Sequence, residues 1–189
     1  MSEYHVPVLL EASLEGLQII PDGIYIDATF GGGGHAKEIT RRLDDKGHLF
    51  VFDQDAEAAA NLWDDDRVTL IQSNFRHLRQ WMMYYGVHGK INGILADLGV
   101  SSHQFDDPQR GFSYRYDEPL DMRMNQAQKL TAADILNQYS AEDLQQMFSR
   151  YGEITNARTL AQHIVQVRSA RPIATTGQLV NNVECLISG

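Results

Sequence analysis

Cysteine is almost absent from this sequence, which has one, Cys185, among 189 residues. A single cysteine excludes an internal disulfide and a cysteine-based metal site, and such scarcity fits a reducing compartment. Long hydrophobic runs are also missing. No stretch approaches the length of a membrane span, and the first residues lack the basic and apolar regions of a secretory signal. We therefore expect a cytoplasmic protein with no membrane partner.

Positive charge is scarce as well, with 16 Lys and Arg against 25 Asp and Glu and a formal net charge of −9. Most of the acidic excess lies in residues 1–103, and the rest of the chain is closer to neutral. Contact with nucleic-acid phosphates needs local positive charge whatever the total. If nucleic acid is a partner, its surface is therefore expected in the second part, with Arg110, Arg115 and Arg123 as the phosphate partners; a solvated face is the alternative for these arginines.

Glycine, in contrast, is concentrated in one place. Four consecutive glycines, 31–34, follow the apolar run Ile24–Ile26 and precede a helical pattern. A glycine backbone can adopt positive φ and lets a ligand approach the main chain, and the helix that follows directs its unpaired amides toward that ligand. A flexible linker would instead lie between polar segments. The turn predicts a nucleotide or nucleoside site.

Apolar runs alternate with helical patterns in the first hundred residues. Strands are predicted at 24–28, 48–53, 67–72 and 90–96, and helices at 5–20, 36–43, 56–63 (capped by Asp55) and about 74–85. This alternation is typical of a doubly wound parallel sheet, whose ligand lies at the carboxyl ends of the strands.

The second part of the chain has a different character. Residues 99–130 show no lasting periodicity and predict a long functional loop. Helix starts are predicted after it at Thr131, at Ser140, at Thr155 or Asn156, and at about Thr176.

Acidic residues stand at the ends of two predicted strands. Asp53 lies 20 residues beyond Gly33, where an acid can accept hydrogen bonds from both hydroxyls of a ribose; a solvated carboxylate is the alternative. With Asp55 nearby, the site disfavours the phosphates of a dinucleotide and suits a cationic cofactor, S-adenosylmethionine. Asp97 ends the fourth predicted strand and is expected to face the same crevice.

Two further side chains near the turn have alternative interpretations. Phe75 follows the third predicted strand and either lies against a purine ring or packs in the core. His35 is expected to cap the turn rather than to bind a metal, because the histidines show no ligand spacing. We predict no metal site.

Several motifs, in order along nearly the whole chain, resemble the family of small-subunit ribosomal RNA cytidine methyltransferases called RsmH or MraW. These motifs are Asp27–His35, Phe52–Asp55, Asp97–Ser102, Asp106–Ser113, Pro119–Met124, Thr131–Asn137, Tyr151–Glu153 and Arg171–Gly177. The resemblance implies an α/β fold of the class I S-adenosylmethionine-dependent methyltransferases. A Rossmann-like cofactor-binding part is expected at residues 1–104, and a loop and helical insertion that helps to hold RNA at 105–189.

The resemblance also implies a reaction and its residues. The reaction is methyl transfer from S-adenosylmethionine to the exocyclic N4 amine of a decoding-site cytidine in the 16S rRNA of the small ribosomal subunit. Cofactor contacts are expected at Gly33, Gly34, His35, Asp53, Phe75, Asp97 and Gln104. The expected catalytic acceptor for the target amine is Asp97, with Ser101 or the Leu98 carbonyl as the second candidate.

Members of the resembled family continue well past Gly189, into later strands of the sheet. We therefore expect an incomplete sheet, in which residues 91–96 form an exposed edge that pairs with a second copy as a homodimer, and weak or absent methyl transfer. Two other function classes stay open. One is a nicotinamide-dependent oxidoreductase built on the same glycine turn, and the other is a non-catalytic fragment that binds cofactor or RNA only.

Overall fold

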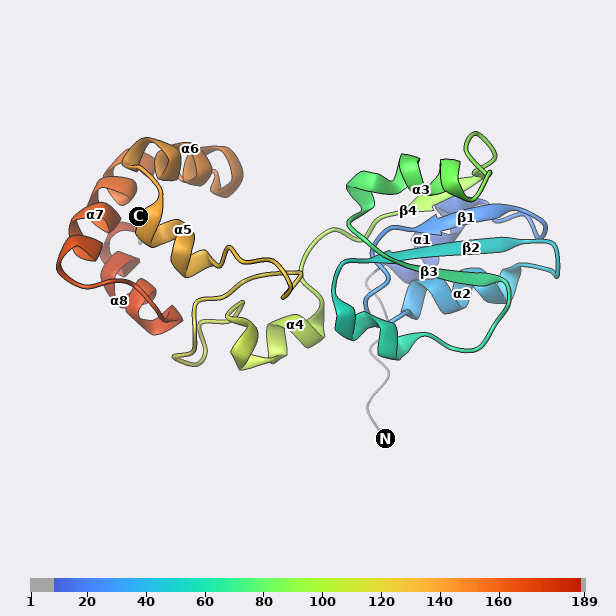
Figure 1. Cartoon of the computed structure of the whole chain (residues 1–189), viewed down its shortest axis with the longest axis horizontal. Helices are drawn as coiled ribbons and strands as arrows, with labels where there is room; N and C mark the ends of the chain where they lie inside the picture. Colours follow the sequence, from blue (N-terminus) through green and yellow to red (C-terminus); the bar gives the residue numbers. More distant parts are fainter. Residues whose placement is uncertain (1–8, 188–189) are drawn as a thin grey trace. The chain divides into compact units, whose positions relative to one another are not determined.

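The computed structural model describes residues 9–187, and of Ile187 the backbone only. The chain divides after Gly99 into two compact units. The first unit contains a four-stranded sheet in the order β3-β2-β1-β4 (Figure 1). Its strands are β1 (Ile24–Asp27), β2 (His48–Asp53), β3 (Val68–Gln72) and β4 (Gly93–Leu95), and all neighbours are parallel. The predicted α/β parallel architecture is confirmed.

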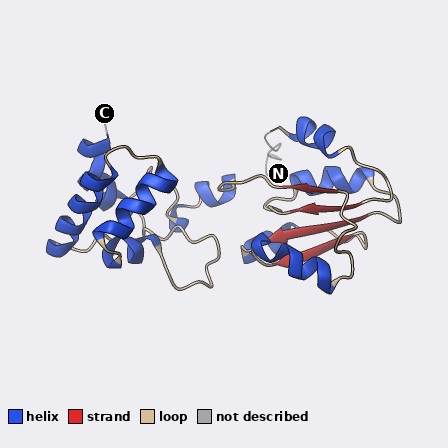
Figure 2. Cartoon of the chain, turned by 90° about the horizontal axis from the view of Figure 1, so that it is seen from above, coloured by secondary structure: helices blue, strands red, loops and turns tan. Residues whose placement is uncertain are grey.

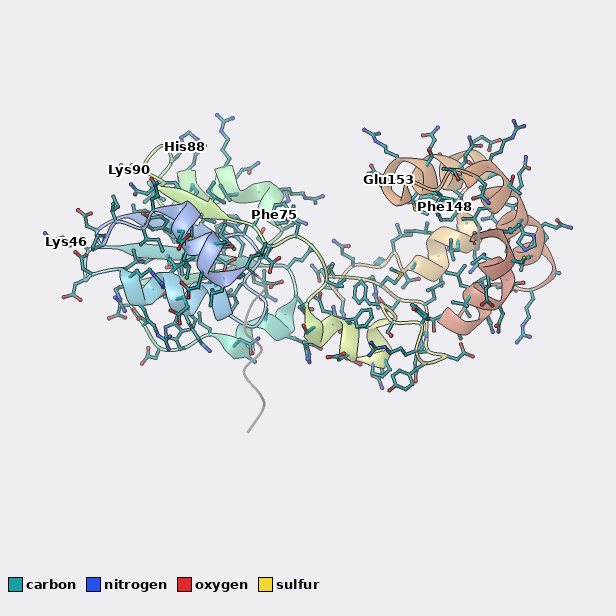
Figure 3. All side chains as sticks on the ribbon, turned by 180° about the vertical axis from the view of Figure 1, so that it is seen from behind. Lys46, Phe75, His88, Lys90, Phe148 and Glu153 are labelled. Atoms are coloured by element: carbon teal, nitrogen blue, oxygen red, sulfur yellow. The ribbon has the colours of Figure 1, made fainter. Side chains whose placement is uncertain are left out.

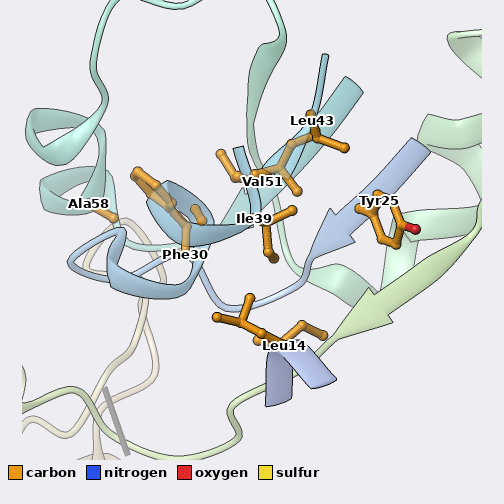
Figure 4. Packing of buried hydrophobic residues seen from close by; sticks show 10 residues of the cluster. Leu14, Tyr25, Phe30, Ile39, Leu43, Val51 and Ala58 are labelled. Atoms are coloured by element: carbon orange, nitrogen blue, oxygen red, sulfur yellow. The ribbon is translucent and has the colours of Figure 1, made fainter. Parts of the chain in front are cut away.

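Helices cover both faces of this sheet, because its strands are apolar on both sides. In β2, Leu49 and Val51 join one core cluster, whereas Phe50 and Phe52 join the cluster on the opposite face. The first cluster packs against α1 (Leu10–Leu17) and α2 (Gly34–Arg42), and Figure 4 shows Leu14 and Ile39 of these helices beside Tyr25 of β1. The second cluster packs against α3 (Leu78–Tyr84).

Several predicted elements of this unit are shorter than expected. The helix predicted at 5–20 is seen as α1, which ends at Leu17 rather than at residue 20, and residues 5–8 lie outside the described part. The helix predicted at 74–85 begins as a 3₁₀ turn, η2 (Phe75–His77), before α3. The strand predicted at 90–96 was too long. β4 has three residues, since within residues 9–187 it pairs with β1 alone.

The α-helix predicted at 56–63 is wrong in type, because the segment is a 3₁₀ helix, η1 (Ala56–Asn61). Its predicted cap is confirmed: the Asp55 carboxylate accepts a hydrogen bond from the Glu57 amide at 3.2 Å. At its end the Asn61 side chain donates to the Gly31 carbonyl at 2.9 Å. The segment is thus tied to the glycine turn.

The second unit is helical around its own apolar core (Figure 2). Its helices are α4 (Ser102–Asp106), η3 (Pro108–Arg110), α5 (Ala132–Gln138), α6 (Ala141–Gly152), α7 (Ala157–Ala170) and α8 (Thr176–Ile187). The predicted caps Thr131 and Ser140 are confirmed, since each hydroxyl accepts an amide three residues on. The long loop predicted at 99–130 is interrupted by two short elements, α4 and η3, and the rest of it, from Gly111 to Leu130, contains no helix.

Two of the three arginines predicted to contact RNA phosphates have structural roles. Arg110 is 1% exposed, and its guanidinium donates to the carbonyls of Arg123 at 3.0 Å and Met124 at 3.3 Å. Arg123 forms a two-pronged pair with Asp121, at 2.8 and 2.6 Å. Burial overturns the prediction for Arg110, and Arg123 is already held by a carboxylate. Arg115 is exposed.

Candidate functional site

The carboxyl ends of three strands meet at the turn that follows β1. The Phe30 amide donates to the Phe52 carbonyl of β2 at 2.9 Å. The Thr29 hydroxyl accepts a hydrogen bond from the Asp97 amide, just beyond β4, at 2.8 Å. The glycine turn therefore starts from a backbone that is fixed to both neighbouring strands, at the edge where parallel sheets place their ligands.

The glycines of the turn have distinct roles. Gly31 and Gly33 have φ values of 49° and 75°, a left-handed conformation that costs other residues about 1–2 kcal/mol. A Cβ at Gly33 would also lie 3.0 Å from the Phe30 ring. A Cβ at Gly32 would meet no protein atom within 4 Å. Gly31 and Gly33 thus serve the fold, whereas Gly32 leaves open space beside the main chain where a ligand could approach.

Asp53 shapes the turn through both of its carboxylate oxygens. One oxygen accepts from the Gly31 amide at 2.8 Å, and the other accepts from the Asp55 amide at 2.9 Å. Each carboxylate oxygen can accept more than one hydrogen bond. The carboxylate is therefore fixed in position and still able to receive hydroxyl donors from a ligand.

Asp27 at the end of β1 is a buried carboxyl beneath this edge. It is 1% exposed, one oxygen accepts from the Thr29 amide at 3.0 Å, and the other has no hydrogen-bond partner among the described residues. Burial, together with the nearby charges of Asp53 and Asp97, raises the pKa of Asp27 from its ordinary value of 3.8 to about 7. The three acidic groups thus lie close enough to interact, and the charges of Asp53 and Asp97 favour a cation.

His35 lies in the first turn of α2 and is 7% exposed. Its Nε2 atom has no hydrogen-bond partner in the described part of the chain. Across that part, no group of three or more His, Cys, Asp or Glu residues is arranged to hold a metal ion. His35 therefore adds a polar ring beside the turn.

Phe75 lies at the carboxyl end of the sheet, and its side chain is open to solvent. Figure 3 shows it at the end of the first unit opposite Lys46, which precedes β2, and Lys90, which precedes β4. Phe75 is 43% exposed, so its interpretation as a core residue is wrong. The preceding Asn74 donates to the Gln54 side chain at 3.0 Å, which fixes this end of β3 to the end of β2.

Ser101 and Gln104 belong to the second unit. They form the capping box of α4: the Ser101 hydroxyl accepts from the Gln104 amide at 3.2 Å, and the Gln104 side chain accepts from the Ser101 amide at 3.1 Å. This Ser-x-x-Gln spacing is a sequence signal that could have predicted α4. The other predicted site residues all lie in the first unit, where the turn, Asp53 and Asp97 come together.

Sequence reasoning gave no role to Asp27 or Thr29, although both lie in the motif around the glycines. Asp27 interacts with Asp53 and Asp97, and Thr29 bonds to the backbone of Asp97. The signal that could have identified them is an acid at a strand end followed two residues later by a hydroxyl, directly before a glycine turn.

Comparison with known proteins identifies the family. A model of the MraW methylase family matches residues 2–189. The chain belongs to this family. The family resemblance based on the motifs is thereby confirmed. Among the described residues of this MraW-family chain, no helix is long and apolar enough to cross a bilayer.

Curated relatives of this MraW-family chain share one name, ribosomal RNA small subunit methyltransferase H. That of Parabacteroides distasonis is 54% identical over 181 residues, covering 96% of this chain and 59% of the relative. That of Flavobacterium johnsoniae is 55% identical over 177 residues, 94% of this chain and 58% of the relative. That of Porphyromonas gingivalis is 53% identical over 190 residues, which cover 99% of this chain and 61% of the relative. The chain spans about three fifths of the length of these relatives.

Proposed function

We propose that this chain carries the cofactor-binding part of a methyltransferase for small-subunit ribosomal RNA, with S-adenosylmethionine as the methyl donor. The observation that carries the proposal is the glycine turn with three acidic groups at the carboxyl edge of the sheet. Relatives named ribosomal RNA small subunit methyltransferase H support the substrate class. The finer proposal is the exocyclic N4 amine of a decoding-site cytidine in 16S rRNA.

The residues present suit this cofactor in charge and shape. Bound S-adenosylmethionine supplies a methyl group activated by a positive sulfonium. Asp53 and Asp97, which lie close enough to Asp27 to raise its pKa, favour a cation and disfavour the phosphates of a dinucleotide. The space beside Gly32 admits a ligand close to the backbone amides at the start of α2.

The positions of the residues in the first unit support the assignments that follow, and Gln104 of the second unit is assigned from the family resemblance alone. Asp53 is fixed and retains acceptor capacity, so we assign it to the ribose hydroxyls. The exposed ring of Phe75 is assigned to the adenine. Gly33, Gly34 and His35 are assigned to the remainder of the cofactor, with Asp97 and Gln104 as further contacts.

The chemical difficulty lies in the target amine, whose lone pair is delocalised into the cytosine ring. An acceptor for its N–H favours a tetrahedral nitrogen, which is the better nucleophile. We assign this role to Asp97, whose carboxylate is exposed and whose backbone is held by Thr29. Ser101 or the carbonyl of Leu98 is the second candidate. The target base has to be unpaired or flipped out for this contact.

Two architectural proposals accompany this function. The cofactor-binding part comprises residues 1–104, and residues 105–189 form the insertion that helps to hold RNA. A second copy of the chain is proposed to pair along β4, where Ile94 is 52% exposed and, among the described strands, β1 is the sole neighbour.

The alternative function that stays closest is binding of cofactor or RNA without catalysis by this length of chain. The test is methyl transfer from tritiated S-adenosylmethionine to isolated small subunits, comparing this chain with a version extended to the length of its relatives. Label incorporated at a cytidine N4 by the extended version supports the proposal. Cofactor binding by both versions with transfer by the extended version alone would favour the alternative for this length of chain, and no transfer by either version would contradict the proposed reaction.

A further inference from the structure

Tyr114 and Tyr116 expose their rings on the surface of the second unit. Tyr114 is 77% exposed and Tyr116 is 58% exposed. Within residues 9–187, neither ring stacks on another aromatic ring. The packing of the described core therefore does not explain why large aromatic side chains occupy these two positions.

The backbone that carries these rings is fixed. Ser113 is 5% exposed, and its hydroxyl accepts from the Arg115 amide at 3.2 Å. The Thr176 hydroxyl, at the start of α8, donates to the Tyr116 carbonyl at 2.7 Å. The next residue, Asp117, accepts from the Gly177 amide at 3.0 Å. The tyrosines thus project from an anchored segment, and binding a ligand there needs little ordering of the backbone.

An exposed cation stands between the two rings in sequence. The guanidinium of Arg115 lies 5.4 Å from the centre of the Phe105 ring, which holds it in place by a cation–π contact. The nearest acid along the chain, Asp117, is already bound to the amide of Gly177. We call residues 114–116 the tyrosine surface.

We propose that the tyrosine surface binds unpaired nucleotides of the RNA substrate, with bases stacked on the rings of Tyr114 and Tyr116 and Arg115 on the phosphate backbone. Proteins hold single-stranded RNA by this combination of aromatic faces and positive charge. A protein interface would favour further apolar side chains beside the rings, whereas their neighbours along the chain are Arg115 and Asp117. The inference rests on the proposed function, because it takes RNA as the substrate.

The test is binding of a short, fluorescently labelled, unpaired RNA to the chain, followed by fluorescence anisotropy. Tyr114→Ala and Tyr116→Ala should each weaken binding about fivefold or more, the loss of one stacked base. Tyr114→Phe and Tyr116→Phe keep the ring and should bind normally. The matched control is Tyr151→Ala, since Tyr151 is also 77% exposed and also lies beside an arginine, Arg150 at 5.8 Å. This control should bind as the unaltered chain does.

The inference would be overturned by unchanged affinity in the alanine variants, by an equal loss in Tyr151→Ala, or by no RNA binding by the unaltered chain. Loss of binding to whole small subunits but not to free RNA would also overturn it, because the rings would then contact a ribosomal protein. Calorimetry with S-adenosylmethionine separates the two proposals. Absence of cofactor binding counts against the proposed function. Normal cofactor binding, together with an RNA affinity that the tyrosine substitutions do not change, counts against this inference alone.

Discussion

The hydroxyl of Thr29 accepts a hydrogen bond from the amide of Asp97 at 2.8 Å, and the amide of Thr29 donates to the buried carboxyl of Asp27 at 3.0 Å. One threonine thus joins the ends of β1 and β4. This contact sets where the backbone of Asp97 stands relative to the glycine turn. Since Asp97 is the proposed acceptor for the target amine, Thr29 is a positioning residue for it.

Replacing Thr29 with Val removes that acceptor at nearly constant volume. The Asp97 amide then loses a hydrogen bond worth about 1 kcal/mol, so we expect affinity for S-adenosylmethionine to fall about fivefold while the chain stays folded. Thr29→Ser keeps the hydroxyl and should bind as the unaltered chain does. Calorimetric titration checks both variants, and equal affinities for Val and Ser would contradict the positioning role.

Gly32 and Gly33 should respond differently to substitution. A Cβ at Gly32 would meet no protein atom within 4 Å, so we expect Gly32→Leu to leave the melting temperature unchanged and to abolish cofactor binding. Gly33→Ala forces a side chain into a left-handed conformation beside Phe30 and should cost about 1–2 kcal/mol of stability. Thermal melts and cofactor titrations distinguish the two. Normal cofactor binding by Gly32→Leu would show that the ligand does not approach this backbone.

The buried Asp27 makes stability depend on pH. Its folded pKa, about 7, lies above its ordinary value of 3.8, so the fold favours the protonated carboxyl. The contribution of Asp27 to the free energy of unfolding is fully present below about pH 4 and is lost as the pH rises through 7. Above that pH the ionised, buried carboxylate costs on the order of 4 kcal/mol. Asp27→Asn should remove this dependence. Urea unfolding at pH 5 and pH 8 measures this dependence. An equal change in the free energy of unfolding between the two pH values in the unaltered chain and in Asp27→Asn would contradict the raised pKa of Asp27.

Substitutions of Arg110 and Arg115 should distinguish an arginine that stabilises the fold from one that lies on the surface. Arg110→Met leaves the carbonyls of Arg123 and Met124 without their buried donor, and we expect a loss of about 2–3 kcal/mol. Arg115→Ala should change stability by less than about 0.5 kcal/mol and instead lower the salt dependence of RNA binding. Chemical unfolding and RNA titrations at several salt concentrations measure the two effects. A stable Arg110→Met variant with weakened RNA binding would restore Arg110 as a phosphate partner.

Local sequence signals predicted the parts of the fold that local physics determines. The bounds of β2 and the caps Thr131 and Ser140 follow from alternation and from side-chain hydrogen bonds three residues apart, and the structure has them as predicted. The 3₁₀ form of η1 was missed because its end is held by the Gly31 carbonyl, a contact between distant residues.

The same distinction applies to the candidate site. The position of Asp53 beside the turn could be predicted from spacing, because parallel strands end at one edge. The burial of Arg110 and the raised pKa of Asp27 could not, since each depends on what distant segments pack around the side chain. The sequence marks both residues as charged, and only the fold shows that neither faces solvent.

The most direct test of the central claim is calorimetric titration of the unaltered chain with S-adenosylmethionine and, separately, with NADH. The glycine turn with its acidic surroundings predicts saturable binding of S-adenosylmethionine at one site and no binding of NADH. Binding of NADH, or no heat of binding with S-adenosylmethionine at any concentration of the folded chain, would contradict it.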